Sequence, residues 1–229
     1  MDIYIVRHGT TDWNREHRIQ GRTDIPLDGI GRRMAKDSGE ALTKLGIRFD
    51  RVYSSPLKRA YETAELLCPG QEIVTDERLI ELSFGECEGK VSDGLLADGD
   101  HPFRFFKKDP VNYNRTIGTV GGETLDGLMA RTREFMQQVI EPLASVQGNA
   151  SVLISGHGAM NRGLLMYIRN TNDLSGFWGT GLQANCGITK VTLTCDKYTI
   201  VDNCRIYYDK DLMIDPEFLI AEHTDNSDK

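Results

Sequence analysis

The sequence predicts an α/β protein with three layers, in which helices cover both faces of a mostly parallel β-sheet. The chief observation is that short apolar segments alternate with segments of helical spacing from residue 2 to residue 168. Such alternation is typical of a parallel sheet, because each helix returns the chain to the edge where the next strand begins. The length of 229 residues is also sufficient to bury a substantial core.

The first third of the chain supplies three strands and two helices. The strands are expected at residues 2–7, 51–54 and 72–75. The first helix is expected at 29–45, where apolar residues recur at helical spacing and Gly46 follows as a C-terminal cap. The second helix is expected to begin at Ser55-Pro56, a capping residue before a proline, and to end near residue 67.

The remainder begins with an irregular stretch and then becomes regular again. Residues 84–122 are rich in glycine and charge, so we expect an insertion lying over one end of the sheet. The later elements are a long helix, a buried strand, a helix and a strand hairpin, expected at 123–146, 151–155, 158–168, 187–194 and 198–207. We expect one domain over residues 1–229, with a tail after residue 211 that ends in disorder.

Composition narrows the class of function. The formal net charge of -7 disfavours a general binder of nucleic acid or of anionic membranes. No stretch approaches the roughly 18 apolar residues that span a bilayer, and no signal-peptide pattern is found, so we expect a cytoplasmic protein. Five cysteines without Cys-x-x-Cys spacing indicate reduced thiols. We expect no metal or cofactor, because the 98–101 cluster of Asp, Gly and His lacks a second set of ligands.

Two separated strands end in similar residues. The first ends at Arg7-His8-Gly9, and the strand at 151–155 leads into Gly156-His157-Gly158. Ligands of α/β proteins bind beyond the carboxyl ends of the strands, so both histidines should face one crevice. The helix after the strand at 51–54 carries Arg59, and its N-terminal amides would favour an anion. These residues together predict a phosphate site.

The same residues belong to a longer ordered series. Its members are Arg7-His8-Gly9 with Trp13-Asn14, the run from Gln20 to Leu27, the run from Ser54 to Ala60 with Thr63-Ala64, Leu79-Ile80-Glu81, Phe84-Gly85 with Glu88-Gly89, the run from Gly121 to Thr124, and the run from Ser155 to Gly158. On this series the chain resembles the histidine phosphatase superfamily, in its phosphoglycerate mutase-like branch. The resemblance implies that family's three-layer fold.

The resemblance also implies a phosphohistidine mechanism. His8 would attack phosphorus through one ring nitrogen, while the other nitrogen hydrogen-bonds the carbonyl of Gly9. Nearby cations would lower the pKa of His8 and keep the ring neutral. The phosphoryl group would be bound by Arg7, Asn14, Gln20, Gly21, Arg59, His157 and Gly158.

The leaving alkoxide needs a proton donor. The resemblance assigns this role to Glu81, which would then act as the base for an attacking water. Spacing alone does not decide between carboxylates, so Glu86, Glu88 and, more remotely, Asp24 stay open as alternatives.

Three residues depart from the family's common pattern. Thr10 stands where a glutamate usually follows Arg-His-Gly, Gly156 stands where a serine usually precedes the second histidine, and Cys87 stands where many members have tryptophan. None of these changes removes a chemical role.

The favoured function is a metal-independent phosphomonoesterase that acts through a phosphohistidine on a small phosphorylated metabolite. One alternative is phosphoryl transfer of the phosphoglycerate mutase type. It is disfavoured because residues 82–89 differ from the mutase pattern and the insertion lacks the mutase's paired arginines. Another alternative is a non-catalytic protein that binds a phosphorylated ligand. The sequence does not determine the oligomeric state.

Overall fold

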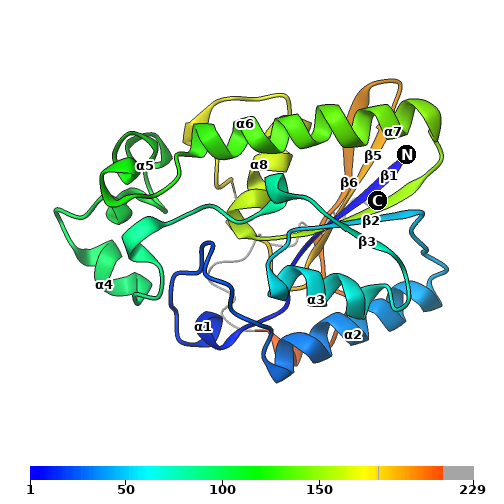
Figure 1. The fold of residues 1–229 in the computed structure, drawn as a ribbon, viewed down its shortest axis with the longest axis horizontal. Coiled ribbons are helices and arrows are strands. Elements are labelled where there is room, and N and C mark those ends of the chain that lie inside the picture. Colours follow the sequence, from blue (N-terminus) through cyan, green and yellow to red (C-terminus); the bar gives the residue numbers. More distant parts are fainter. Residues whose placement is uncertain (180, 214–229) are drawn as a thin grey trace, which may run out of the picture.

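A mixed six-stranded β-sheet forms the centre of the computed structural model, which describes residues 1–179 and 181–213 (Figure 1). The strand order is β3-β2-β4-β1-β5-β6. The first four strands in this order run parallel, whereas β5 is antiparallel to both β1 and β6. The strands are β1 (Asp2–Arg7), β2 (Arg51–Ser54), β3 (Ile73–Thr75), β4 (Ser151–Gly156), β5 (Ile188–Thr194) and β6 (Lys197–Arg205). The mostly parallel sheet is therefore confirmed, whereas the expected tail end lies outside the described residues.

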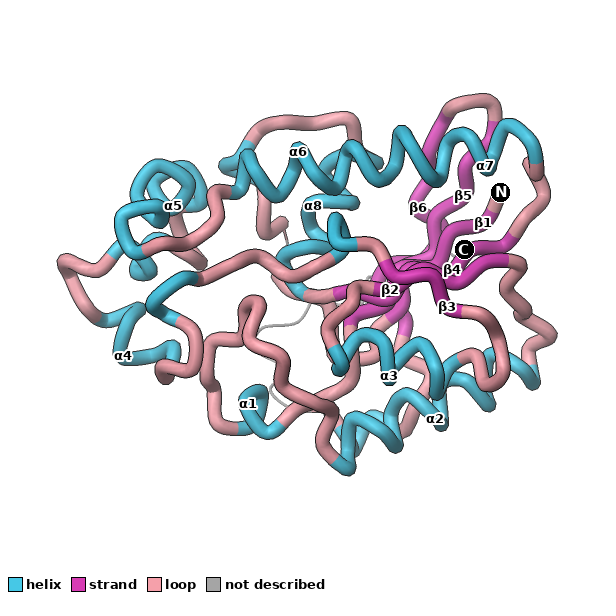
Figure 2. Tube along the Cα trace, in the orientation of Figure 1, coloured by secondary structure: helices cyan, strands magenta, loops and turns pink. Residues whose placement is uncertain are grey.

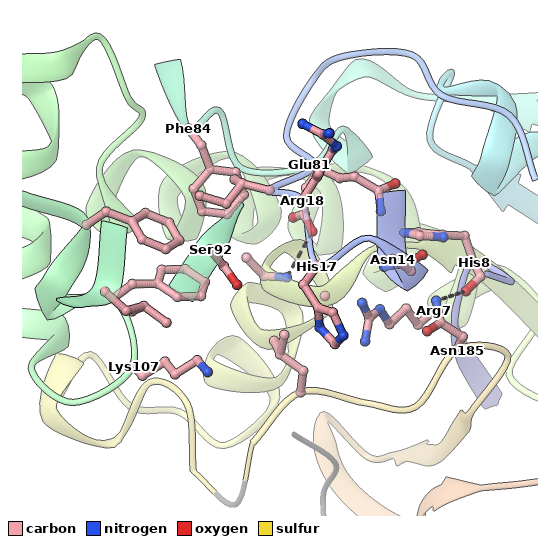
Figure 3. Close-up of a pocket in the computed structure, with 18 residues that line it drawn as sticks. Arg7, His8, Asn14, His17, Arg18, Glu81, Phe84, Ser92, Lys107 and Asn185 are labelled. Atoms are coloured by element: carbon pink, nitrogen blue, oxygen red, sulfur yellow. Dashed lines mark hydrogen bonds between the residues drawn. The ribbon is translucent and has the colours of Figure 1, made fainter. Parts of the chain in front are cut away.

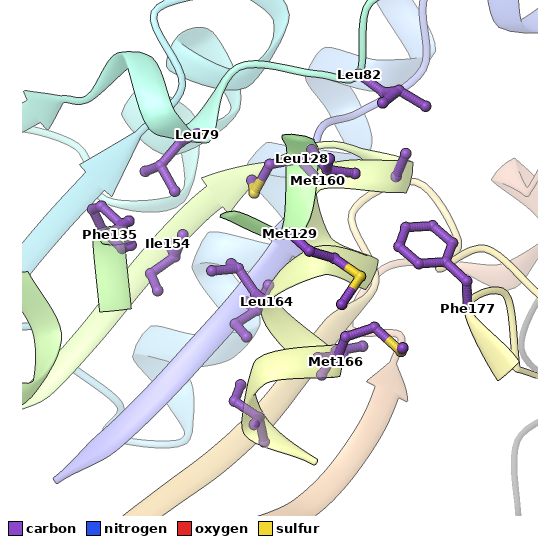
Figure 4. Packing of buried hydrophobic residues seen from close by; sticks show 14 of the residues in the cluster. Leu79, Leu82, Leu128, Met129, Phe135, Ile154, Met160, Leu164, Met166 and Phe177 are labelled. Carbon is purple, nitrogen blue, oxygen red and sulfur yellow. The ribbon is translucent and has the colours of Figure 1, made fainter. Parts of the chain in front are cut away.

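Helices cover both faces of this sheet, as the sequence predicts (Figure 2). Side chains alternate along β1: Ile3 and Ile5 pack with one group of helices, while Tyr4 and Val6 pack with the other. The first group is α6 (Leu125–Phe135), α7 (Glu141–Val146) and α8 (Gly158–Ile168). The second group is α2 (Gly29–Lys44) and α3 (Lys58–Leu67). Figure 4 shows the larger core, in which Leu128 and Leu164 approach Ile154 of the sheet.

The register of β1 on β4 determines where the two histidines lie. Arg7 is paired with Gly156, so the two parallel strands end side by side. The amide of His8 then donates to the carbonyl of Gly156 at 2.9 Å. Both strand-end histidines are consequently held at one edge of the sheet.

The start of α3 differs from the expectation. Ser55 and Pro56 precede the helix, which begins at Lys58 after Leu57, a residue whose side chain makes no capping hydrogen bond. The carboxylate of Asp24 instead accepts from the amide of Lys58 at 2.8 Å. The anion at this helix end is therefore the Asp24 carboxylate of the chain itself and not a bound ligand.

The helix expected at 123–146 is continuous but changes its winding. Thr124 caps its N-terminus, and a π-helical turn at Met136–Ile140 separates α6 from α7. Pro142 follows this turn and has no amide to donate to the preceding turn, which accounts for the local change.

The expected insertion is more helical than its composition indicates. It contains α4 (Ser92–Ala97) and α5 (Pro110–Thr116), with short 3₁₀ turns at Gly85–Cys87, Pro102–Phe105 and Ile117–Val120. Buried aromatic side chains hold it together, and Asp109 caps α5 before Pro110. A β-bridge between Arg18 and Val91 joins it to the loop that follows α1 (Asp12–Arg15). Further 3₁₀ turns lie at Glu77–Leu79, Leu174–Gly176 and Lys210–Leu212.

All five cysteines lie in the described part of the chain, and none forms a disulfide there. Cys68, Cys87, Cys186, Cys195 and Cys204 are free thiols. Across residues 1–179 and 181–213, no helix is long and apolar enough to cross a membrane.

Two glycines permit the chain after β1 to lie against α2. A Cβ atom on Gly31 would lie 2.6 Å from the amide nitrogen of Thr10, and one on Gly9 would lie 2.9 Å from the carbonyl carbon of Gly31. These obstructing atoms are backbone atoms, so no side-chain rotation relieves the clash. The loop that carries His8 is therefore in direct backbone contact with the first turn of α2.

We predict that Gly31→Ala lowers the free energy of unfolding by about 1–3 kcal/mol, which is typical of overpacking in a close-packed site. Gly29→Ala in the same turn is the matched control, because nothing lies within 4 Å of its Cβ position. That control should be neutral or stabilising by up to about 1 kcal/mol. Urea unfolding measures both variants, and equal effects would contradict the backbone contact.

Candidate active site

A pocket of about 180 Å³ opens beyond the carboxyl ends of β1 and β4 and extends along the insertion (Figure 3). Arg7, His8 and Asn185 lie at one side in Figure 3, and Phe84 and Lys107 lie at the opposite side. The pocket is lined by Arg7, His8, Asn14, His17, Arg18, Ile19, Gln20, Glu81, Phe84, Ser92, Leu96, Phe103, Phe106, Lys107, Gly158, Ala159, Leu182 and Asn185.

His8 is buried and held in one orientation. Its Nδ1 lies 2.7 Å from the carbonyl oxygen of Gly9, which fixes the proton on Nδ1 and leaves the lone pair on Nε2. Burial, followed by the charges of Arg59 and Arg7, holds the pKa of His8 well below 6.5 although the Gly9 carbonyl opposes the shift. The neutral ring was expected, but burial contributes more to it than the cations do.

Residues far away in the sequence support the His8 loop. Asn185 donates to the carbonyl of His8 at 2.9 Å, and the Thr63 hydroxyl accepts from the amide of Gly9 at 3.0 Å. Thr63 was within the matched series, but Asn185 was not predicted. It follows β1 by more than 170 residues and lies in no recognisable motif, so no sequence signal could have identified it.

Two buried arginines keep their charge available to an anion. Arg7 donates from Nη1 to the carbonyl of Gln183, and Arg59 donates to the carbonyls of Gly21 and Thr23. These partners are neutral, so neither guanidinium is compensated by a contacting carboxylate. Burial lowers the pKa of Arg59 to about 10 and also lowers that of Arg7, but both remain cations at neutral pH. Arg7 lines the pocket, whereas Arg59 is fully buried and is not among the lining residues.

His157 lies beside His8, with the two ring centroids 5.2 Å apart. Its Nε2 lies 2.8 Å from the hydroxyl of Ser55, while its buried Nδ1 has no hydrogen-bond partner among the described residues. Burial and then the charge of Arg59 hold the pKa of His157 well below 6.5. An incoming anion would offset both effects, so Nδ1 can become a charged donor when a phosphoryl group binds.

Glu81 lies where the pocket meets the N-terminus of α8. Its carboxyl group accepts from the amides of Ala159 and Met160 at 3.2 and 2.9 Å. Burial raises the pKa of Glu81 above its ordinary value, although these amides, that of Leu82 and the charge of Arg59 oppose the shift. A buried carboxyl with a raised pKa can hold a proton at a pH where an exposed one has lost it.

Arg131 fixes the backbone that leads into Glu81. Its Nη1 donates to the carbonyls of Arg78 and Ile80 at 2.7 and 2.6 Å, and its remaining nitrogens pair with Glu123. Glu123 thus anchors the arginine that positions the Glu81 segment.

The alternative carboxylates have other surroundings. Glu88 accepts from the amides of Arg22, Thr23 and Phe84 and from the Thr23 hydroxyl. Burial raises the pKa of Glu88, but these hydrogen bonds outweigh it and hold the pKa below 4.5. Glu86 is exposed, and Asp24 caps α3. Glu81 is the member of this set that lines the pocket with His8.

Of the remaining residues expected to bind the phosphoryl group, three line the pocket and one does not. Asn14, Gln20 and Gly158 line the pocket. Both amide atoms of Gln20 are buried without a hydrogen-bond partner within the described part of the chain, so they are available to a ligand. Gly21 does not line the pocket, and its carbonyl instead accepts from Arg59.

The three departures from the family pattern are accommodated structurally. The Thr10 hydroxyl donates to Asp28, the capping residue of α2, at 2.8 Å. A side chain at Gly156 would crowd Met160 and come within 2.6 Å of the Asn161 carboxamide oxygen. Cys87 is fully buried among the apolar residues of the main core. None of the three disturbs the arrangement around His8.

No cluster of three or more histidine, cysteine, aspartate or glutamate side chains that could hold a metal occurs in residues 1–179 and 181–213. The Asp98–His101 segment therefore holds no such cluster. His101 instead caps the turn at Pro102–Phe105 by accepting from the amide of Phe103.

A family model of the histidine phosphatase superfamily, branch 1, matches residues 3–204. The chain belongs to the histidine phosphatase superfamily. The expected family and fold are thus confirmed. Because the superfamily and its structural neighbours are phosphatases and mutases, this histidine phosphatase family member is a phosphoryl-transfer enzyme.

Individual similarities cover most of the chain. It is 34% identical over 168 residues to phosphoglycerate mutase-like protein 4 of Arabidopsis thaliana, covering 71% of this chain and 69% of that protein. The structure of YhfR from Bacillus stearothermophilus is similar with a TM-score of 0.75 and 28% identity, covering 87% of this chain and 95% of that one. A mycobacterial glucosyl-3-phosphoglycerate phosphatase has the same fold, with a TM-score of 0.75, 24% identity and coverage of 87% and 96%.

We predict that Glu88→Gln weakens the binding of inorganic phosphate about tenfold, measured by isothermal titration calorimetry. An amide oxygen accepts fewer hydrogen bonds than a carboxylate, so residues 21–23 should loosen their hold on Arg59. Removing a negative charge would by itself tighten anion binding, so the expected direction is diagnostic. Glu86→Gln, two residues away and exposed, is the control and should leave the affinity unchanged. Tighter binding by Glu88→Gln would contradict the positioning role.

Proposed function

We propose that this protein is a metal-independent phosphomonoesterase that forms a phosphohistidine on His8. The observation that carries the proposal is the orientation of that ring. Nδ1 is held by the Gly9 carbonyl, and Nε2 keeps its lone pair in a pocket lined also by Glu81 and Arg7. A nucleophile, a proton donor and a cation thus surround one space of the size of a small phosphorylated metabolite.

In the first step the Nε2 lone pair of His8 attacks phosphorus, and the bond between phosphorus and the ester oxygen breaks. The leaving oxygen takes the proton of Glu81, so an alcohol departs rather than an alkoxide. Arg7, Arg59 and His157 stabilise the charge on the phosphoryl oxygens, because their charges act in a buried site of low polarity. Gln20 and Asn14 supply further hydrogen bonds from the pocket wall.

In the second step water attacks the phosphohistidine. Glu81, now ionised, takes a proton from the water, and the bond between phosphorus and Nε2 breaks. Inorganic phosphate leaves, the Nε2 lone pair is restored and Glu81 is again protonated. No metal is required at either step, since fixed cations of the chain supply the positive charge.

A mutase is the second candidate, and the 34% identity to a phosphoglycerate mutase-like protein favours it. A mutase returns the phosphoryl group to a bound acceptor instead of to water. The sequence after Glu81 and the composition of the insertion favour hydrolysis. Incubation with 3-phosphoglycerate separates the two: release of inorganic phosphate supports the phosphatase, and formation of 2-phosphoglycerate supports the mutase. A protein that only binds phosphorylated ligands would do neither and would also leave p-nitrophenyl phosphate unhydrolysed.

We predict that the wild-type protein hydrolyses p-nitrophenyl phosphate in EDTA and forms a phosphoenzyme that is labile in acid and stable in alkali. His8→Ala should abolish turnover and labelling by a radioactive phosphoester, because no other side chain replaces Nε2. His17→Ala, which changes an exposed histidine at the pocket rim, should still be labelled. Labelling of His8→Ala would show that the nucleophile is wrong.

The two pKa shifts predict a bell-shaped dependence of kcat/KM on pH for an alkyl phosphate. His8 must be neutral, and its lowered pKa places the loss of activity on the acid side below pH 6.5. Glu81 must be protonated, and its raised pKa keeps it so above its ordinary value of 4.5, with activity lost as the pH rises through the shifted pKa.

Glu81→Gln should slow alkyl phosphates about 10²- to 10⁴-fold and remove the alkaline limb that Glu81 causes, while aryl phosphates lose much less. Glu86→Gln is the control carboxylate and should keep the wild-type profile. Ionisation of the substrate is the same for every variant, so differences between profiles report the enzyme. Equal losses on alkyl and aryl esters would exclude Glu81 as the general acid.

A further inference from the structure

The side of the pocket opposite His8 is apolar and rich in rings. Phe84, Phe103 and Phe106 line it, together with Leu96 from α4 and Leu182 from the chain after α8. Phe103 and Phe106 are stacked, with ring centroids 4.9 Å apart and ring planes 11° apart. Phe84 meets both rings edge-on. The pocket therefore joins a phosphate-binding end to an aromatic end (Figure 3).

This aromatic wall is held rigidly from behind. Phe106 contacts Trp178 and Tyr113, with ring centroids 4.4 and 5.3 Å away. The Trp178 indole also donates to the Phe106 carbonyl. Phe84, Phe103 and Phe106 are each at least nine-tenths buried. The wall thus exists before a ligand arrives, and a ligand gains apolar contact without having to order it.

Leu182 continues the apolar surface towards the reacting groups. A Cβ atom on Gly158 would lie 3.3 Å from a methyl group of Leu182 and 3.7 Å from the Glu81 carboxyl group. The alcohol that takes the proton of Glu81 would therefore leave the reacting centre beside a methyl group. An apolar alcohol fits this exit better than one with several hydroxyl groups, which would lose hydrogen bonds to water.

Two cations, Arg18 and Lys107, border the pocket on this side. Arg18 is exposed and already engaged, with Nε 2.6 Å from a Glu16 oxygen and Nη1 2.7 Å from the Gly89 carbonyl. Lys107 lies at the far side of the pocket from His8, and its amino group points toward the middle of the pocket in Figure 3. Rings and methyl groups thus supply most of the surface at this end, while Ser92 and Lys107 add polar groups to it.

We propose that the substrate is a phosphomonoester of an apolar alcohol carrying about one ring, whose ring rests on Phe84, Phe103 and Phe106. This inference rests on the proposed phosphatase function and narrows it. Phosphoesters of small carboxylic acids, such as phosphoglycerate, would leave the aromatic wall uncovered. The aromatic end of the pocket is thus the part that selects the substrate.

The test compares alkyl phosphates whose leaving groups have similar acidity. Ethyl phosphate is the reference, and phenylalkyl phosphates with two, three or four methylene groups probe the aromatic end. We expect kcat/KM for the best phenylalkyl phosphate to exceed that for ethyl phosphate about 10- to 100-fold, as burial of one ring implies. 3-Phosphoglycerate should be no better than ethyl phosphate.

Two neighbouring leucines of α4 provide a matched pair of variants. Leu95 and Leu96 are both half-buried, but only Leu96 lines the pocket. Leu96→Asn should reduce the ratio of phenylalkyl to ethyl activity at least about fivefold, because a polar amide would border the ring. Leu95→Asn should keep the wild-type ratio. The ratio does not depend on the fraction of folded enzyme, so loss of stability does not imitate the effect.

The outcomes separate this inference from the function on which it rests. Turnover of ethyl phosphate with a ratio near one, or a preference for 3-phosphoglycerate, overturns the apolar substrate and leaves the phosphatase intact. An unchanged ratio in Leu96→Asn overturns the assigned position of the ring. Failure to hydrolyse any phosphomonoester overturns the proposed function and the inference together.

Discussion

The parallel pairing of β1 with β4 is the constraint on which the rest of the site depends. With Arg7 opposite Gly156, both strands end at the same level, and the chain places His8 and His157 within ring contact. A shift of one residue would turn the side chains of a strand to the opposite face of the sheet. The core residues that alternate along β1, packed by helices on both faces, hold this register. The packing that holds the core therefore also fixes the position of His8.

Burial then gives the histidines and arginines their chemical character. Arg7 and Arg59 are satisfied by backbone carbonyls, so their hydrogen-bonding needs are met without neutralising their charge. The same burial lowers the pKa of His8, which favours the neutral ring, and raises the pKa of Glu81, which favours the protonated carboxyl group. The site is thus positively charged and suited to a phosphoryl dianion. Glu88 holds the loop that binds Arg59, and Arg131 holds the segment that leads into Glu81. These two charged residues therefore act on the site through its backbone and not by direct contact with a ligand.

In the proposed phosphatase, the insertion would add selectivity to a general phosphate site. Its rings pack against Trp178 and the main core, so the wall facing His8 is part of the folded domain rather than a loose cover. The bridge between Arg18 and Val91 joins it to the loop that leads to Gln20. The segments proposed to bind the phosphate and the alcohol therefore support each other structurally.

The sequence by itself determined the alternation of strands and helices, the position of two histidines at strand ends, and the family. These features depend on apolar periodicity and on short ordered motifs, which are local properties of the sequence. Tertiary structure decided the rest. The start of α3 depends on Asp24, which approaches from another segment, and the helices of the 84–122 insertion depend on aromatic contacts that have no sequence period. The choice of Glu81 over Glu88 depends on burial and on amides of α8, and Asn185 reaches His8 only through folding. Local propensity is encoded by neighbours in sequence, whereas burial, pKa and the pairing of distant groups exist only once the chain has folded.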